Sequence, residues 1–296
     1  MRQKKFLAAL TCLLFGLSGA FACPGCMAWD DAAWCADENP AVSTRWYVDR
    51  NADVSFAFSD DNRVTVSNAF WDGGSQVFSK SGTYRIEYKY GVPFIRFYWD
   101  AHNSPRAIGE RFLMLRNEDF MVLYRDNTEP AFVAFRRWEG QGLLSPLQAV
   151  TASATLTEGH LHYAATPQRL GTHINRVWAV EGGVGERLHI ERFAWQRELV
   201  LSIGYVHFSR PYLFKANARP KRLRISYSGD SSRFMEVELA DTPQYQVISL
   251  KPLGFAPWGL GRLTESIIIE ILEIRPGFRY NHLCINSVMW IVDNRP

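Results

Sequence analysis

The stretch RLRISYSGDSSRFMEVELA, residues 222–240, decides the fold of the C-terminal half of this chain. Apolar side chains alternate with polar or small ones in two runs: Leu223, Ile225 and Tyr227, then Met235, Val237 and Leu239. Because successive side chains of a β-strand point to opposite faces, this period of two predicts strands with one apolar face. Such strands need a second layer to cover that face.

Two further runs toward the C-terminus also predict strands. Residues 268–274 lead to the turn signal Arg275-Pro276-Gly277, and residues 283–292 form the last apolar run. A convincing helical period is absent throughout the sequence. Two facing sheets would bury these apolar rows, so we predict a β-sandwich over residues 148–293.

The N-terminal half shows the same period with closer turns. Residues 54–58 and 85–90 alternate, and Asn117-Glu118-Asp119 separates the apolar runs 112–115 and 120–124. About eight strands in roughly a hundred residues is typical of a small up-and-down barrel. We therefore predict an antiparallel β-barrel over residues 43–140, and the Gly/Pro-containing segment Gly140–Pro146 marks the boundary.

The predicted barrel is loosely similar to small lipocalin-like domains. Trp46 near its start, followed by a Phe-x-Phe strand, carries that similarity. The interior of such a barrel either holds a hydrophobic ligand or is filled by aromatic side chains. An eight-stranded barrel is just wide enough for side chains to fill it, so we favour the filled interior.

The first residues predict export. Three basic side chains within Met1–Lys5, an apolar run from Phe6 to Gly19 and the small-x-small sequence Ala20-Phe21-Ala22 form a signal peptide over residues 1–22. The apolar run is shorter than the roughly 20 residues that a membrane-spanning helix needs. We expect an extracytoplasmic protein that is secreted, periplasmic or lipid-anchored at the cell envelope, with no transmembrane segment.

The cysteines leave the choice between secretion and lipidation open. Cys23 directly follows the predicted cleavage site and is the candidate for lipidation, at the start of a tether over residues 23–42. Cys26 and Cys35 are candidates for a disulfide in an oxidising compartment. Cys284 lies in an apolar run and is expected to be a small buried hydrophobe. A redox or zinc function for Cys23-x-x-Cys26 is disfavoured, because the sequence offers no second pair and no thioredoxin-like context.

Composition and motifs argue against several function classes. With 33 Lys and Arg against 30 Asp and Glu, no strong field favours nucleic acid. Gly-x-Ser-x-Gly, His-Glu-x-x-His and P-loop motifs are absent, so we expect no enzyme activity. His160-x-His162 lacks nearby further ligands for a metal. We expect no cofactor, although a structural calcium ion stays open: Asp60-Asp61-Asn62 offers part of a ligand set.

Six segments of the C-terminal half stand in a characteristic order and spacing: residues 155–163, 177–186, 203–206, 217–223, 239–246 and 274–285. They resemble the NADase-type glycan-binding domain, also called the NAD glycohydrolase translocation domain, of the discoidin-like (coagulation-factor type C) galactose-binding jelly rolls. Two departures concern ligand specificity: Ile203 stands where the family commonly has Asn before Gly-Tyr, and Thr172–Asn175 replaces an Asp-Gly turn.

The resemblance implies a jelly roll that binds glycan without catalysis, because NAD hydrolysis in such proteins belongs to a separate domain. Aromatic rings and planar polar groups on loops suit a sugar ring and its hydroxyls. Alternative structural roles are a core anchor for Trp178, a turn for Asn217, and an ion pair of Asp241 with Arg219 or Lys221. The candidate ligand-binding residues are Trp178, Glu181, Tyr205, Asn217, Arg219 and Tyr280.

The leading hypothesis is therefore an exported or lipid-anchored envelope protein whose partner is a cell-surface carbohydrate. Two other hypotheses remain. In the first, the sandwich does not bind sugar and contacts other proteins of the envelope. In the second, the N-terminal barrel carries a hydrophobic ligand.

Overall fold

The structure is a computed structural model, and it describes residues 45–48, 55–69, 78–100, 110–125, 129–136, 143–192, 196–254 and 265–292. The predicted signal peptide and tether, with Cys23, Cys26 and Cys35, lie outside the described residues. Within the described part of the chain, no helix is long and apolar enough to cross a membrane.

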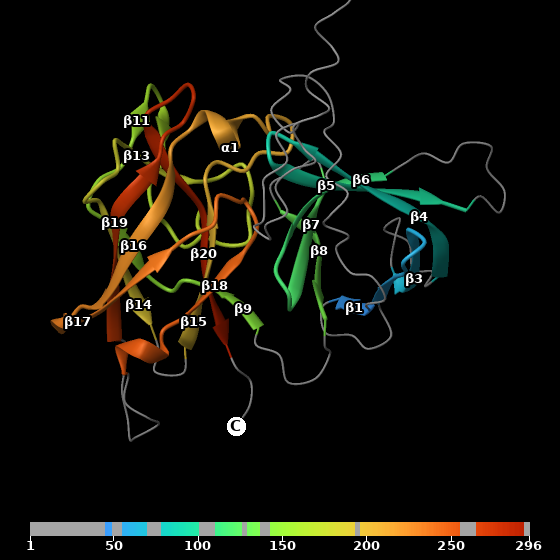
Figure 1. The fold of residues 1–296 in the computed structure, drawn as a ribbon, viewed down its shortest axis with the longest axis horizontal. Coiled ribbons are helices and arrows are strands. Elements are labelled where there is room, and N and C mark those ends of the chain that lie inside the picture. The colour runs from blue at the N-terminus through green and yellow to red at the C-terminus, as the bar shows by residue number, and fades with distance from the viewer. Residues whose placement is uncertain are drawn as a thin grey trace, which may run out of the picture.

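The N-terminal half is a closed antiparallel barrel, as predicted (Figure 1). Each strand pairs with the next, and β1 pairs with β8 to close the barrel. The predicted turn at Asn117–Asp119 joins β6 to β7. The strands are β1 (Arg45–Val48), β2 (Ser55–Phe58), β3 (Arg63–Ala69), β4 (Phe78–Lys89), β5 (Val92–Trp99), β6 (Glu110–Arg116), β7 (Phe120–Tyr124) and β8 (Pro130–Phe135).

Aromatic side chains fill the barrel interior. Phe56 stacks with Phe97 at 5.9 Å between ring centroids and meets Phe132 edge-on at 5.5 Å. Phe58 meets Tyr84 edge-on at 5.0 Å. Ring pairs at these separations are in favourable contact, which supports the interpretation of the interior as a packed core.

The C-terminal half is the predicted β-sandwich. One sheet has the strand order β10-β14-β19-β16-β17, and the other has the order β13-β20-β15-β18, with β9 also paired to β20. The two sheets share one apolar core. The strands are β9 (Leu143–Pro146), β10 (Val150–Ala152), β13 (Trp178–Glu181), β14 (Arg187–Arg192), β15 (Gln196–Ile203), β16 (Arg219–Tyr227), β17 (Asp230–Glu238), β18 (Gln246–Ser249), β19 (Glu265–Arg275) and β20 (His282–Val292).

Three small elements decorate the sandwich. The hairpin β11 (Thr157–Glu158) and β12 (Leu161–His162) lies at the same end of the sandwich as β13 (Figure 1). The short helix α1 (Leu213–Ala216) precedes β16, and the 3₁₀ turn η3 (Lys251–Leu253) follows β18. The described chain is otherwise strands and connections.

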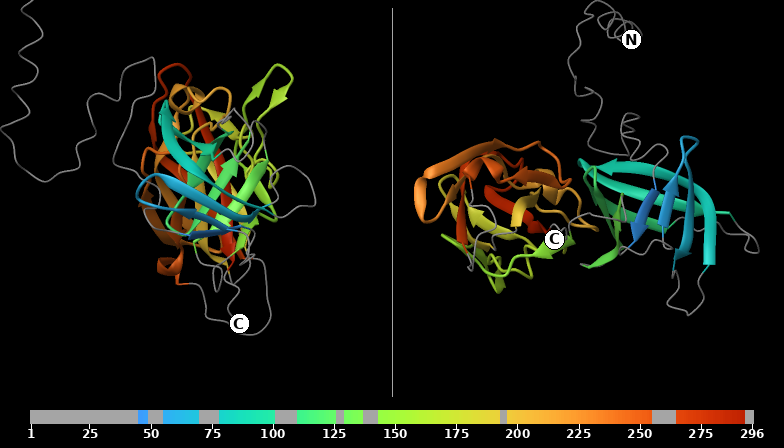
Figure 2. Two further views of the ribbon diagram at one scale, coloured as in Figure 1. Left: turned by 90° about the vertical axis from the view of Figure 1, so that its right-hand side faces the viewer. Right: turned by 90° about the horizontal axis from the view of Figure 1, so that it is seen from below.

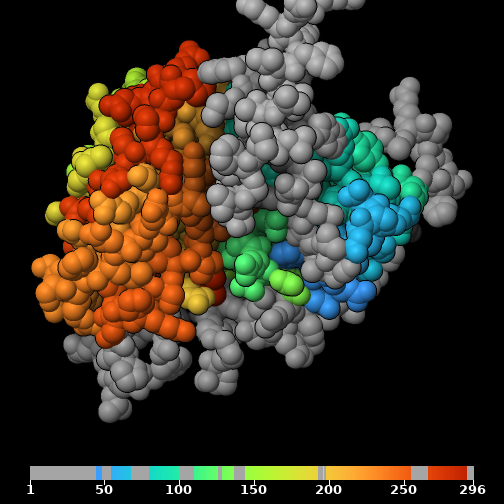
Figure 3. Space-filling view, in the orientation of Figure 1, coloured from blue at the N-terminus to red at the C-terminus, as the bar shows by residue number. Residues whose placement is uncertain are grey.

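The barrel and the sandwich are packed against each other (Figure 2, Figure 3). In β6, Phe112 and Met114 face the barrel interior, while Leu113 and Leu115 belong to the same apolar cluster as the sandwich core. The hydroxyls of Tyr124 in the barrel and Tyr245 in the sandwich are 2.8 Å apart and buried. The two halves therefore share one continuous apolar core.

Candidate functional site

Strand alternation divides the two faces of the β13–β20 pair. Trp178 and Val180 enter the sandwich core, so Ala179 between them faces outward. On that outer face Ala179 forms a small apolar cluster with Cys284. Cys284 is buried and forms no disulfide, as its apolar run in the sequence predicts. Tyr163 and Tyr205 pack against this cluster and border the solvent.

Trp178 is an anchor of the sandwich core. Its side chain is fully buried, and its indole Nε1 donates a hydrogen bond to the carbonyl oxygen of Ala154 at 3.0 Å. A buried indole that has satisfied its N–H in this way stabilises the fold. Burial removes Trp178 from the surface that a ligand can reach.

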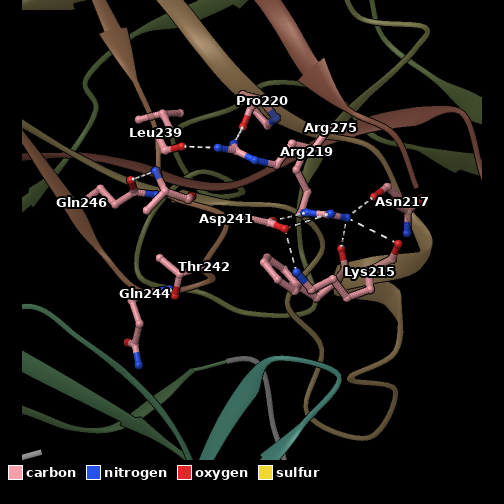
Figure 4. Close-up of polar contacts among 12 residues, drawn as sticks. Lys215, Asn217, Arg219, Pro220, Leu239, Asp241, Thr242, Gln244, Gln246 and Arg275 are labelled. Carbon is pink, nitrogen blue, oxygen red and sulfur yellow. Dashed lines mark hydrogen bonds and ion pairs between the residues drawn. The ribbon is translucent and has the colours of Figure 1, made fainter. Parts of the chain in front are cut away.

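Asn217 and Arg219 form a structural clasp around α1 (Figure 4). The Asn217 amide donates to the Leu213 carbonyl at 2.9 Å and caps the end of the helix. The Arg219 guanidinium is only 5% exposed, and its Nε donates to the Asp241 carboxylate at 2.7 Å. Its Nη1 donates to the carbonyls of Phe214 and Asn217 at 2.9 Å and 2.8 Å. Both side chains are thus used by the fold.

The carboxylate of this clasp stays charged although it is half-buried. Burial raises the pKa of Asp241, but hydrogen bonds from Arg219 and Lys215 outweigh that effect and hold the pKa below its ordinary value of 3.8. Lys215 Nζ lies 2.7 Å from the carboxylate. Of the two pairings that the sequence left open for Asp241, the structure shows the one with Arg219, whereas Lys221 pairs with Glu273.

Glu181, Tyr205 and Tyr280 remain accessible at one end of the sandwich. Glu181 is exposed at the end of β13, opposite His282 in the strand register. Tyr280 stacks on His282 with ring centroids 6.0 Å apart and an interplanar angle of 11°. Tyr205 is the second residue after β15 and is half-buried. Three of the six predicted residues are therefore within reach of a ligand.

Tyr205 and Tyr280 belong to a larger surface, and Glu181 borders it. We call it the tyrosine–histidine surface, and it consists of Tyr163, Tyr205, His207, Tyr280 and His282. Glu158 of the hairpin connects its parts, because it lies 3.7 Å from His282 and its charge acts on the pKa of Tyr163. Burial, with the neighbouring Tyr205 and Glu158, raises the pKa of Tyr163 to about 12. Tyr163 therefore stays a neutral hydroxyl at physiological pH.

The loop that follows β15 completes the surface. His207 lies 6.0 Å from Tyr205 between ring centroids, and Arg210 Nε donates to the His207 ring at 3.2 Å. On its other side, Phe208 packs edge-on against Phe94 of the barrel at 5.5 Å. The guanidinium of Arg111 lies 3.7 Å from the centre of the Phe94 ring. The barrel thus helps to hold the loop that carries Tyr205.

Sequence reasoning missed Glu158, His207, Arg210 and His282. The β11–β12 hairpin that carries Glu158 has strands of only two residues, too short for a detectable period. His282 was detectable in principle, since it stands at the accessible start of a strand whose residues 283–290 are all buried. Together these groups offer aromatic faces, hydroxyls, carboxylates and guanidinium groups on one accessible surface.

Residues 143–291 match the family model described as the NAD glycohydrolase translocation F5/8 type C domain, which covers half of the chain. The chain belongs to this family. No curated protein matches the chain significantly. A cryo-EM structure of the arabinofuranosyltransferase AftD from Mycobacteria aligns with 64% of this chain and 14% of its own, at 11% identity and a TM-score of 0.30. That TM-score is too low to equate the two folds, and the chain spans a small part of that protein's length.

In this NAD glycohydrolase translocation domain, the two departures from the usual pattern, Ile203 and Thr172–Asn175, adjoin the loop that carries Tyr205. Ile203 itself is fully buried. Gly204 has a positive φ of 78° and turns the chain directly before Tyr205. Asn175 also has a positive φ of 63°, and its side-chain oxygen accepts a hydrogen bond from the backbone N–H of Phe208 at 3.0 Å. Both segments thus shape the loop that carries Tyr205 and His207.

The translocation domain gathers no metal-binding cluster of three or more His, Cys, Asp or Glu within the residues that the structure describes. His162 Nδ1 lies 2.9 Å from the Thr157 hydroxyl, and His160 is exposed in the hairpin turn. Asp61, a candidate calcium ligand, accepts hydrogen bonds from Ser59 and from the backbone of Arg63 within its own turn.

A separate pocket of about 410 Å³ lies beside β9 on the translocation domain. Its β9 side lies away from His282 along β20, because β9 pairs with residues 289–292 whereas His282 begins the strand. Its other side is lined by residues of the 167–173 segment. Its side chains carry no formal charge other than any on His173. The pocket is lined by Leu144, Pro146, Leu147, Gln148, Pro167, Gln168, Gly171, Thr172 and His173.

Proposed function

We propose that this protein binds carbohydrate without catalysis, through the tyrosine–histidine surface of its F5/8 type C domain. The observation that carries the proposal is Tyr205, an accessible tyrosine beside the His207 ring and in the same small cluster as Tyr163. Sugars present an apolar ring face and a fringe of hydroxyls. Aromatic faces next to hydroxyl, carboxylate and guanidinium groups suit both features.

Membership in the translocation family supports a secreted or cell-surface protein. The basic and apolar N-terminus of the sequence supports export, either free or lipid-anchored through Cys23. A cell-surface carbohydrate is then the natural partner. The aromatic packing of the barrel interior supports the sandwich, rather than the barrel, as the part that binds ligand.

A second function, docking to another protein, is favoured by one observation. Three of the most exposed large apolar side chains lie on the loops that surround the tyrosine–histidine surface: Leu161 (48% exposed), Val184 (61%) and Phe278 (50%). Exposed apolar groups gathered in one region are typical of protein interfaces. This alternative predicts that the surface binds a protein partner and no glycan.

A glycan array probed with the full mature chain separates the two functions. We expect binding by the wild type and at least a roughly tenfold loss in the Tyr205→Ala variant, because removing an aromatic stacking face costs on the order of 1–3 kcal/mol. Tyr227→Ala is the matched control, since Tyr227 is a half-buried tyrosine on the other sheet. No glycan binding by the wild type would reject the proposal in favour of protein docking.

A further inference from the structure

Two arginines next to Tyr205 lack a carboxylate partner in the part of the chain that the structure describes. The Arg210 guanidinium donates to the His207 ring, which carries no negative charge. The Arg169 side chain has no ion pair within the described ranges, although its backbone is fixed by Thr166. Burial raises the pKa of Tyr205, and the positive charges of Arg210 and Arg169 oppose that rise, so both act on the tyrosine hydroxyl.

The arginines on the outer face of the other sheet behave differently. Arg187 pairs with Glu270 at 2.9 Å, and Arg222 and Arg224 both pair with Glu236 at 3.1 Å and 2.9 Å. Cross-strand pairing of this kind is the ordinary use of surface charge on a sheet. The uncompensated arginines at Tyr205 are therefore a distinct feature of the tyrosine–histidine surface.

The negative charges near this surface are those of Glu158 and Glu181. Glu158 is engaged by Tyr163 and His282, and Glu181 stands across from His282 at the end of β13. Arg169 and Arg210 instead come from the loops before β13 and after β15. A ligand on Tyr205 would thus lie near the guanidinium groups of Arg169 and Arg210 and near the carboxylate of Glu158.

We infer that the saccharide bound on this surface carries an anionic group, a carboxylate or a sulfate ester, and that Arg169 and Arg210 bind it. The inference rests on the carbohydrate-binding function proposed above and names its ligand class. The planar guanidinium matches a carboxylate or a sulfate with two parallel hydrogen bonds that are strengthened by the opposite charge, and a neutral sugar lacks that charge. Glu158 and His282 are left to bind ring hydroxyls.

The test uses pairs of glycans that differ only in charge. The full chain is probed with sialylated and uronate-containing oligosaccharides, with sulfated ones, and with the neutral counterpart of each. The variant is the double substitution Arg169→Gln and Arg210→Gln. Its control is Arg222→Gln with Arg224→Gln, which removes the same charge from the other sheet.

We expect the anionic member of each preferred pair to bind, with at least a roughly tenfold loss of affinity in the Arg169/Arg210 variant and little change in the control. The carboxylate and sulfate arms identify which anion is bound. Binding of neutral glycans alone would overturn the inference and leave the proposed function intact. Anionic binding that the double variant retains but Tyr205→Ala loses would also overturn it. No binding to any glycan would overturn the proposed function itself.

Discussion

At the scale of single residues, the fold uses side chains of the types that bind sugars elsewhere. Arg219 and Asn217 are planar, multivalent hydrogen-bonding groups, and both satisfy backbone carbonyls around α1. Carbonyls at the end of a helix need donors, and the clasp supplies them from within the chain. The chemistry of a residue type therefore did not distinguish a ligand contact from a structural contact here.

The clasp predicts a large difference between two arginines. Arg219→Leu should lower the free energy of unfolding by about 3 kcal/mol, because Asp241 would keep only Lys215 as a charged partner and the carbonyls of Phe214 and Asn217 would lose their buried donor. Arg224→Leu should cost about 1 kcal/mol or less, since Arg224 is in an exposed ion pair. Urea unfolding measures both. Equal losses in the two variants would contradict the role of the clasp.

The same clasp predicts a pH dependence. Because the pKa of Asp241 is lower in the folded protein than its ordinary value of 3.8, its contribution to stability is complete above that value and is lost as the pH falls below it. Asp241→Asn should therefore be less stable than the wild type at about pH 7, with a gap that narrows toward about pH 3. Urea midpoints across this range measure the gap, and a constant gap would contradict the prediction.

Sequence reasoning could place these residues near the loops but could not separate their roles. For Trp178, the strand alternation favoured a core position, because Val180 is also apolar and lies on the same face of the strand. The Arg219–Asp241 pair spans 22 positions, so it depends on how β16 and the following loop meet in space. Only Glu181, Tyr205 and Tyr280 of the predicted set are accessible.

At the scale of elements, the strands were predictable and the site-forming loops were not. Residues 223–227 and 235–239 fall within or next to β16 and β17, as their period of two predicts. The β11–β12 hairpin and the 204–212 loop lack such a period, and their shapes depend on contacts with β13 and with the barrel. The 204–212 loop supplies Tyr205 and His207 to the tyrosine–histidine surface, and the hairpin supplies the neighbouring Glu158.

The loop after β15 depends on glycine at its first position. Gly204 has a φ of 78°, and an added Cβ would lie 2.6 Å from the Phe214 ring. Gly204→Ala should cost on the order of 1–3 kcal/mol and weaken glycan binding, because Tyr205 would shift with the backbone. Gly185→Ala is the control, since Gly185 also has a positive φ but nothing within 4 Å of an added Cβ. Thermal unfolding measures the loss of stability, and the glycan array measures the loss of binding. Equal losses in Gly204→Ala and Gly185→Ala would contradict the prediction.

At the scale of the whole molecule, the two halves share a core that the sequence indicated only indirectly. Residues 120–124 are five consecutive apolar residues, and all five are buried. Such a run is typical of a strand covered on both faces, whereas an exposed barrel strand would alternate. The sequence pattern predicted the barrel, but only the structure shows that the sandwich covers the outer face of this strand.

The shared core predicts a common response to alkaline pH. Burial, the dominant cause, raises the pKa of Tyr245 to about 12 and that of Tyr124 well above its ordinary value of 10.0. Their pairing therefore stabilises the protein fully below about pH 10 and is lost as the pH rises toward about pH 12. The double variant Tyr124→Phe and Tyr245→Phe should show a weaker loss of stability over this range than the wild type. Separate unfolding transitions for the two halves at neutral pH would contradict the shared core.

The most direct measurement is a crystal structure of the full chain with the saccharide that binds best on the array. We expect the sugar ring to pack against Tyr205 and His207, with its hydroxyls toward Glu158 and its anionic group toward Arg169 and Arg210. Saccharide found in the barrel interior or in the pocket beside β9, with the tyrosine–histidine surface empty, would contradict it.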